Sequence, residues 1–211
     1  MYFADRKDAG RELAHKLEKY RGSSPVVLGL ARGGVPVAAG VAAYLEAPLD
    51  VLVVRKVGAP FQPELAIGAL AGDLLWLNRP LIAALDISVE QVDRAVARER
   101  VEVERRETLY RLGRPAVALE GHIAIVVDDG LATGATAVAA LHALRRKEPK
   151  AIIFAAPVCS HEGADLVAEE ADDVVCLEHP ADFYAVSQAY GSFAQVSDEE
   201  VRETLEAAAP A

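Results

Sequence analysis

The sequence predicts an α/β fold, in which a largely parallel sheet carries helices on both faces. Short apolar, β-branched runs alternate along the chain with segments whose apolar residues recur at helical spacing. This alternation is typical of βαβ units with right-handed crossovers. In addition, three predicted strands end in glycine- or charge-rich segments, ARGG, RKVG and DDGLATGAT. Ligands of open α/β sheets bind beyond the carboxyl ends of the strands, so we expect these segments to meet along one edge.

The elements of the first half follow from capping residues and apolar spacing. Asp5 is expected to cap a first helix, and a strand is expected at residues 26–30. The glycine turn in ARGGVPVAAGVAAYL leads into a second helix. The run LDVLVVRKVG is expected as a second strand, which ends at the basic pair Arg55 and Lys56. AIGALAGDLLWLN predicts a hairpin that turns at Gly72-Asp73.

The second half is predicted to contain a long charged helix and then further strand–helix units. Ser88 and Gln91 form a capping-box pattern, which opens a helix that runs to about Arg111. The final helix is expected to be capped by Asp198. Between them we expect strands at 122–128, 151–158 and 174–177 and helices at about 135–147 and 163–171.

Composition limits the class of protein. With 211 residues, of which 52% are apolar, the chain is long enough to form one sizeable domain, expected over residues 1–211. The net charge of −10 disfavours non-specific nucleic-acid binding, so no nucleic-acid partner is expected. No signal peptide or long apolar span is apparent, so no membrane partner is expected either. The two cysteines, Cys159 and Cys176, lack metal-site spacing, and we expect a cytoplasmic protein in a reducing compartment.

The most informative segment is IVVDDGLATGAT, residues 125–136. An apolar strand stops at Asp128 and Asp129, and a glycine- and threonine-containing loop then leads into a helix. Backbone N–H groups of such a loop, with the positive end of the helix, favour an anion. The ionised carboxylates can only accept hydrogen bonds, which suits ribose hydroxyls or the water shell of Mg²⁺. Ribose 5-phosphate fits both ends of this segment.

Three other interpretations compete with a ribose-phosphate site. DDG alone is compatible with an ordinary turn after a strand. A Walker P-loop needs Gly-Lys-Ser/Thr, whereas this loop has Gly134, Ala135 and Thr136 and no lysine. A Rossmann fingerprint needs G-x-G-x-x-G after a strand, and GLARGGVPVAAG does not supply that spacing.

IVVDDGLATGAT closely resembles the phosphoribosyl-diphosphate (PRPP) binding motif of type I phosphoribosyltransferases, and the whole chain resembles an uncharacterised bacterial group of that family. LGLARGGVPVA is similar to the pyrophosphate loop after the first core strand. VVRKVGAPFQPELAIGALA is similar to the segment that carries a basic pair after the second. The resemblance covers roughly residues 25–160 and implies a phosphoribosyltransferase-like core, a long insert or lid at 58–114 and a small hood at about 178–197.

The resemblance also implies roles for particular residues. Asp128 and Asp129 would bind the ribose hydroxyls, and a non-proline cis peptide is expected near Ala31-Arg32. The implied catalytic residues are Arg32, Lys56, Asp128 and Asp129. The implied PRPP-binding set is Asp128, Asp129, Gly130, Leu131, Ala132, Thr133, Gly134, Ala135 and Thr136. The implied pyrophosphate-binding set is Ala31, Arg32, Gly33, Gly34, Arg55 and Lys56, with plain turns or solvated strand ends as the alternative.

The reaction implied by the resemblance displaces pyrophosphate from C1 of ribose through an oxocarbenium-like state. Mg²⁺ is the implied cofactor, held mainly by PRPP oxygens and water with no direct protein ligand, and a homodimer is expected. In purine-type members, an acid three residues past the second aspartate serves as general base, but this chain has Ala132 there. The acceptor, an unknown small molecule, therefore stays open. A PRPP-binding regulator without transferase activity and a phosphoribosyl or nucleotide hydrolase are the alternative functions.

Three further clusters have both a functional and a structural interpretation. Arginines of the charged helix (Arg94, Arg98, Arg105 and Arg106) would either reach pyrophosphate or form a solvated face or subunit contact. In ADFYAVSQAYGSF, Phe183, Tyr184 and Tyr190, near Phe193, would either stack on the acceptor or form aromatic core. Cys159, Ser160 and His161 follow a strand, but no partner set for nucleophilic catalysis is evident.

Overall fold

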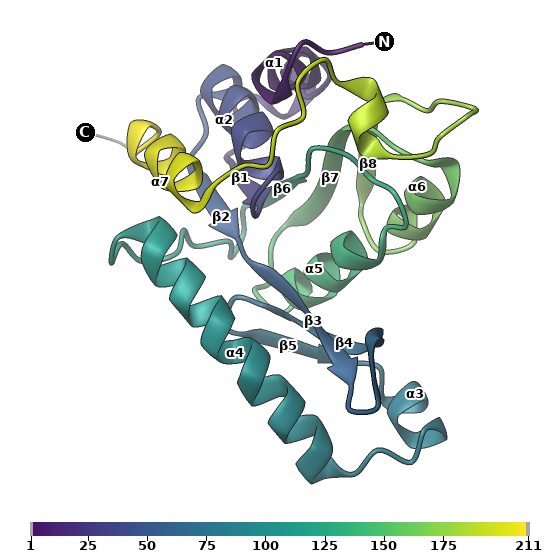
Figure 1. The fold of residues 1–211 in the computed structure, drawn as a ribbon. Helices are drawn as coiled ribbons and strands as arrows, with labels where there is room; N and C mark the ends of the chain where they lie inside the picture. The colour runs from purple at the N-terminus through teal and green to yellow at the C-terminus, as the bar shows by residue number, and fades with distance from the viewer. Residues whose placement is uncertain (1, 210–211) are drawn as a thin grey trace.

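The main sheet of the protein has five parallel strands in the order β2-β1-β6-β7-β8 (Figure 1). The computed structural model describes residues 2–209. The strands are β1 (Pro25–Leu30), β2 (Leu49–Leu52), β6 (Ile123–Val127), β7 (Ala151–Val158) and β8 (Asp173–Glu178). The prediction of an α/β fold with a parallel sheet is confirmed.

Helices cover both faces of this sheet, as predicted (Figure 1). Since side chains alternate along a strand, Val27 and Ile125 face one way and Leu28 and Val126 face the other. The first set packs with α1 (Arg6–Lys16) and α2 (Gly34–Leu45). The second set packs with α5 (Ala135–Arg145), and α6 (His161–Ala168) extends this layer. Both faces of the central strands are therefore buried, which explains their unbroken apolar sequence.

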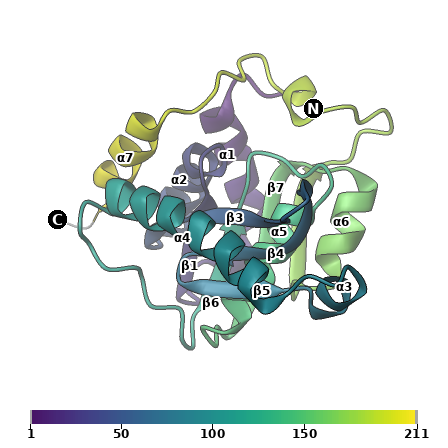
Figure 2. The same cartoon turned by 60° about the horizontal axis from the view of Figure 1, so that its bottom comes forward.

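The predicted insert forms a second, antiparallel sheet with a long helix. Strands β3 (Val54–Ala59), β4 (Gln62–Ala71) and β5 (Leu74–Leu77) lie in the order β3-β4-β5, and β4 and β5 form the hairpin expected at Gly72-Asp73. Helix α3 (Arg79–Ala84) follows, and α4 (Val89–Arg111) lies along this sheet (Figure 2). Expecting LDVLVVRKVG as one strand was wrong. The chain leaves the parallel sheet at Val53, so β2 and β3 belong to different sheets.

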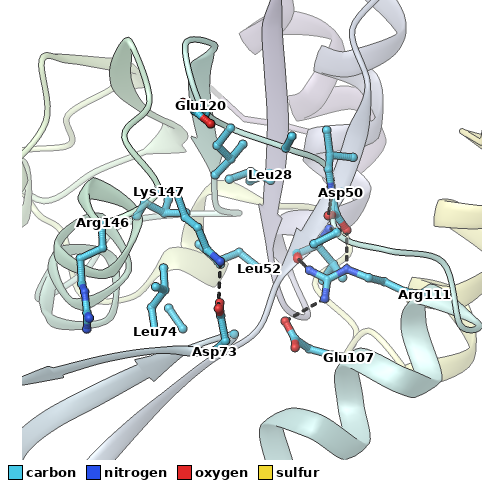
Figure 3. Close-up of a pocket in the computed structure, with 18 of the residues that line it drawn as sticks. Leu28, Asp50, Leu52, Asp73, Leu74, Glu107, Arg111, Glu120, Arg146 and Lys147 are labelled. Carbon is cyan, nitrogen blue, oxygen red and sulfur yellow. Dashed lines mark hydrogen bonds and ion pairs between the residues drawn. The ribbon is translucent and has the colours of Figure 1, made fainter.

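Asp50 anchors the insert to the main sheet (Figure 3). The side chain is buried at the start of β2, and its Oδ1 accepts a 2.9 Å hydrogen bond from Arg111 Nε at the end of α4. Its Oδ2 accepts another, of 2.9 Å, from the Val117 N–H in the segment that returns to β6. Arg111 also donates to the Val51 carbonyl and pairs with Glu107. One carboxylate thus ties together both chain connections to the insert.

Most of the predicted helix caps are confirmed. The Asp5 side chain accepts from the Asp8 N–H at the start of α1, and Ser88 and Gln91 form the reciprocal capping box of α4. The cap of the last helix was placed one residue too late. Ser197 caps α7 (Asp198–Ala207), because its hydroxyl accepts from the Glu200 N–H, so Asp198 is the first helical residue. The 3₁₀ turns are η1 (Glu18–Tyr20) and η2 (Val186–Ala189). Within residues 2–209, no helix combines the length and the apolar character that a membrane span requires.

Candidate functional site

The predicted site segments meet where the strand order reverses. After β1 the chain passes through α2 to β2 on one side, and after β6 it passes through α5 to β7 on the other. The carboxyl ends of β1 and β6 are neighbours, since Gly29 pairs with Val127. Such a switch point leaves a crevice between the two diverging loops, which is the usual ligand site of open α/β sheets. ARGG and DDGLATGAT are the two loops that leave it.

The ARGG loop lies directly against the two aspartates. A Cβ on Gly33 would be only 2.0 Å from Asp129 Oδ2, and a Cβ on Gly34 would be 2.4 Å from the Val127 carbonyl oxygen. Glycine is therefore needed at both positions for the loops to approach this closely. The Ala31-Arg32 peptide is cis, as expected from the family resemblance.

The loop at residues 130–136 is held by backbone hydrogen bonds to the chain at the end of β7. The Leu131 N–H donates to the Val158 carbonyl, and the Ser160 N–H donates to the Leu131 carbonyl, each at 2.8 Å. Gly134 starts α5 with a left-handed backbone, φ +76°, and no side chain in the described chain caps that helix. Ala132, Thr133 and Ala135 are exposed. The loop is thus held rigidly while the amino end of α5 keeps backbone donors for an anion.

The two carboxylates interact strongly. The Asp129 N–H donates to Asp128 Oδ1 at 2.9 Å. Burial, and then the neighbouring Asp129 charge, raise the pKa of Asp128 well above its ordinary value. Burial also raises the pKa of Asp129, while Arg6 opposes that shift. A half-buried like-charge pair of this kind is costly to the fold and is typical of functional sites.

Because ionised Asp128 is disfavoured in the folded state, the variant Asp128→Asn is expected to be more stable than the wild type at pH 7, by on the order of 1 kcal/mol. Asparagine keeps an acceptor for the Asp129 N–H without the charge. Above the raised pKa, ionised Asp128 lowers the free energy of unfolding of the wild type. This loss becomes smaller as the pH falls through that pKa, because Asp128 then takes up a proton. Urea denaturation across a pH series should therefore show that the difference in free energy of unfolding between the variant and the wild type becomes smaller as the pH is lowered. A less stable variant at pH 7 would contradict this assignment.

Arg6 contacts Asp129, which the sequence did not reveal. The Arg6 Nε donates to Asp129 Oδ2 at 2.7 Å, although the two residues are 123 positions apart. Both side chains line a cavity of about 490 Å³. The cavity is bounded by the two loops, α1 and the segment after β8, through Arg6, Arg32, Gly33, Asp129, Val186, Phe193, Gln195 and Val196. Four residues of the segment after β8 thus line the same cavity as Asp129.

Arg32 lies on the same cavity and also approaches α7. Its Nη1 is 3.6 Å from Asp198 Oδ1, and Asp198 in turn accepts a 2.6 Å hydrogen bond from the Tyr110 hydroxyl. The Arg32 side chain is 28% exposed, so the guanidinium remains accessible to a ligand. Two guanidinium groups and one carboxylate thus line this cavity.

The structure places the basic pair away from this cavity. Arg55 and Lys56 lie on β3 of the second sheet, and neither is among the described residues that line the cavity. Arg55 pairs with Glu99 of α4 at 2.9 Å, while Lys56 is exposed. The chain changes sheet at Val53, so this pair belongs to the second sheet, whereas Asp129 follows a strand of the main sheet.

The hood aromatics divide into core and surface. Tyr190 is only 4% exposed, packs with Phe3 and Phe193, and donates its hydroxyl to the Asp129 carbonyl at 2.6 Å. Phe183 packs against the same cluster, whereas Tyr184 is 87% exposed. The structure therefore gives Tyr190 the role of aromatic core beneath Asp129 and leaves its ring no free face for stacking.

The Cys159–Ser160–His161 cluster is structural. Cys159 forms a disulfide with Cys176, because the parallel neighbours β7 and β8 bring their Cα atoms to 6.3 Å. The Ser160 hydroxyl donates to the Ala132 carbonyl at 2.5 Å and caps α6, and His161 stacks on His179. Ser160 thus supports the loop at residues 130–136.

Comparison with known proteins gives the same result as the geometry. Residues 3–192 match the family described as "Phosphoribosyl transferase domain". The chain is 48% identical over 200 residues to proteins from two strains of Mycobacterium tuberculosis, each named "Putative phosphoribosyl transferase". The match covers 94% of this chain and 45% of theirs, so the chain spans less than half the length of these relatives.

Two solved structures share the architecture. The crystal structure of TT1426 from Thermus thermophilus is 42% identical, covers 100% of both chains and has a TM-score of 0.88. A protein of Neisseria gonorrhoeae, solved with bound ppGpp, is 13% identical over 98% of this chain and 96% of its own, with a TM-score of 0.56, which shows the fold alone. Given the matching domain, the identity to these relatives and the switch-point site, the chain belongs to the phosphoribosyl transferase domain family.

Proposed function

We propose that this protein is a Mg²⁺-dependent phosphoribosyltransferase, which transfers ribose 5-phosphate from PRPP to a nitrogenous-base acceptor and releases pyrophosphate. One observation carries this proposal. Acceptor carboxylates, a glycine loop and a helix start without a side-chain cap follow the neighbouring strands β1 and β6 at one switch point, and these groups suit the hydroxyls, the pyrophosphate and the 5′-phosphate of PRPP. We further propose that residues 1–211 act as one domain, as a cytoplasmic homodimer, with 58–114 as a lid.

In this proposal, each part of the site acts on a different part of PRPP. Asp128 and Asp129 accept hydrogen bonds from the ribose hydroxyls, and residues 130–136 surround the 5′-phosphate with N–H donors. Arg32 and the adjacent glycine backbone lie along the pyrophosphate and stabilise the charge that develops as the C1–O bond breaks. Arg55 and Lys56 stay as proposed pyrophosphate ligands that depend on movement of the insert, because β3 holds them outside the cavity.

We propose that Mg²⁺ arrives with the substrate, held mainly by PRPP oxygens and water. Among residues 2–209, no cluster of three or more His, Cys, Asp or Glu side chains is arranged to hold a metal ion. Asp128 and Asp129 supply oxygen atoms, which Mg²⁺ prefers, and they fit its water shell better than direct ligation. When bound, Mg²⁺ would neutralise charge on the pyrophosphate leaving group.

The proposal does not name the base that accepts the ribose. The loop position that serves as general base towards purines in relatives is Ala132, an exposed residue without a titratable group. Tyr184 is exposed on the hood and stays a proposed acceptor contact together with Phe183. The base that accepts the ribose would therefore have to supply a nucleophilic nitrogen without help from that loop position.

A matched pair of glycine variants separates the proposed ligand site from the fold. Gly33 has φ −61°, which alanine tolerates, and the three atoms nearest to its new Cβ would all belong to the Asp129 carboxylate. Gly33→Ala is therefore expected to displace the carboxylate and weaken PRPP binding by about 10- to 100-fold with little loss of stability. Gly34→Ala would press on the Val127 backbone and is expected to cost about 1–3 kcal/mol of stability. Calorimetry and urea denaturation measure the two effects, and full PRPP affinity in Gly33→Ala would count against the site.

The proposed activity is tested by incubating the protein with PRPP, Mg²⁺ and a panel of bases while following pyrophosphate release. Release with one base, abolished by EDTA, is expected for the transferase. Release without any base would support a phosphoribosyl hydrolase instead. Binding of PRPP without release would support a regulator that keeps the site but transfers nothing.

A further inference from the structure

Arg6 occupies a position in the site that the proposed PRPP contacts leave unexplained. Arg6 is the first residue of α1, whose N-cap is Asp5. The side chain of Arg6 therefore lies at the start of the helix, next to the switch point. Its guanidinium lies 3.9 Å from the centre of the Phe193 ring, and Nη1 donates to the Ala194 carbonyl at 2.8 Å. The stacking and the hydrogen bond hold the group from the hood side. Nε points the other way, to Asp129.

The contact with Asp129 is made through one oxygen only. Arg6 Nε donates to Oδ2 at 2.7 Å, and the Arg6 and Asp129 side chains are 11% and 15% exposed. Oδ2 is also the oxygen beside Gly33, because a Cβ there would be 2.0 Å from Oδ2 and 3.2 Å from Oδ1. Arg6 and the ARGG loop therefore enclose Oδ2 together. A carboxylate has acceptor capacity on both oxygens, and the Arg6 contact does not use Oδ1, so we infer that Oδ1 is the oxygen that a ligand would meet.

We propose that Arg6 is a positioning residue of the PRPP site: it holds Asp129 through Oδ2 so that Oδ1 is presented to a ribose hydroxyl. This inference rests on the proposed function, since it assigns how that ligand is held. A guanidinium held on one side by Phe193 and Ala194 leaves the carboxylate little freedom to rotate. Phe193 and Ala194 thus act on ribose binding through Arg6.

The charges around Asp129 support the same role. Asp128 is the nearest like charge, Arg6 is the opposing charge, and Arg32 lines the same cavity. Tyr190 packs beneath and donates to the Asp129 backbone carbonyl, not to the carboxylate. Without Arg6, the buried pair would take up a proton more readily, and a protonated oxygen no longer accepts a hydroxyl hydrogen bond. Arg6 thus favours both the orientation and the acceptor form of Asp129.

The test compares Arg6→Ala, Arg6→Lys and Phe193→Leu with Lys7→Ala as the matched control. Lys7 is on the same helical turn and carries the same charge, but it is exposed and does not line the cavity at Asp129. PRPP affinity is measured by calorimetry, with and without millimolar methylguanidinium, and thermal unfolding shows that each variant is folded. Phe193→Leu leaves the arginine in place and loosens only its support.

We expect Arg6→Ala to bind PRPP about 10- to 100-fold more weakly and methylguanidinium to restore part of that loss. Arg6→Lys and Phe193→Leu should lose less, and Lys7→Ala should match the wild type. Unchanged or tighter binding by Arg6→Ala would overturn the inference, because Arg6 would then be neutral or a competitor for Asp129. A loss that methylguanidinium does not restore, or equal losses in Lys7→Ala, would also overturn it. If the wild type itself binds no PRPP, the proposed function fails and this inference fails with it.

Discussion

Asp50→Ala is expected to lower the free energy of unfolding by about 3–5 kcal/mol. The substitution removes the acceptor of Arg111 Nε and of the Val117 N–H and leaves the Arg111 guanidinium half-paired in a largely buried place. Breaking a buried ion pair by deleting one partner costs far more than the pair itself contributes, because the remaining charge stays desolvated. Since both connections to the insert end on this carboxylate, we also expect the insert to loosen first.

The measurement is urea denaturation of the wild type and the variants. Asp50→Asn retains one acceptor oxygen, which can serve either Arg111 Nε or the Val117 N–H but not both, and should lose about half as much. Lys147→Ala is the control, since Lys147 lines the same pocket as Asp50 and the substitution removes an ion pair with Asp73 in which the lysine side chain is 43% exposed (Figure 3). That exposed pair is expected to contribute less than about 1 kcal/mol. Equal losses in Lys147→Ala and Asp50→Ala would contradict the anchoring role.

Asp129→Ala is expected to weaken PRPP binding by about 10- to 100-fold. In the proposed complex, this carboxylate accepts a charged hydrogen bond from a ribose hydroxyl, and alanine removes both that acceptor and the partner of Arg6. Calorimetry of PRPP with Mg²⁺ measures the change. Asp165→Ala on the exposed face of α6 is a suitable control and should bind like the wild type. An unchanged affinity in Asp129→Ala would remove the proposed role of this residue.

Much of the fold was predictable because the sequence patterns have direct physical causes. The central strands are buried on both faces, which requires continuous apolar runs such as residues 123–127. The capping boxes at Ser88 and Ser197 follow from unsatisfied helix N–H groups, although only the first was recognised. The two loops of the site were found because glycine and paired acids at strand ends are local features. Their meeting followed from the topology of a parallel sheet.

Other features had no local signal. Apart from Asp50, the first half of LDVLVVRKVG is apolar, and nothing in its spacing indicates that the chain changes sheet at Val53. A sequence shows the same aromatic residues whether they stack on a ligand or fill a core. Tyr190 is buried because it packs with Phe3, which lies near the other end of the chain. Arg6 was missed for the same reason, because DRKD reads as an ordinary solvated helix start.

The most direct measurement of the central claim is a crystal structure of the protein with PRPP and Mg²⁺. The account predicts the ribose hydroxyls within hydrogen-bonding distance of Asp128 and Asp129, with the 5′-phosphate enclosed by residues 130–136. PRPP bound elsewhere, or bound here with its sugar turned away from both carboxylates, would contradict it.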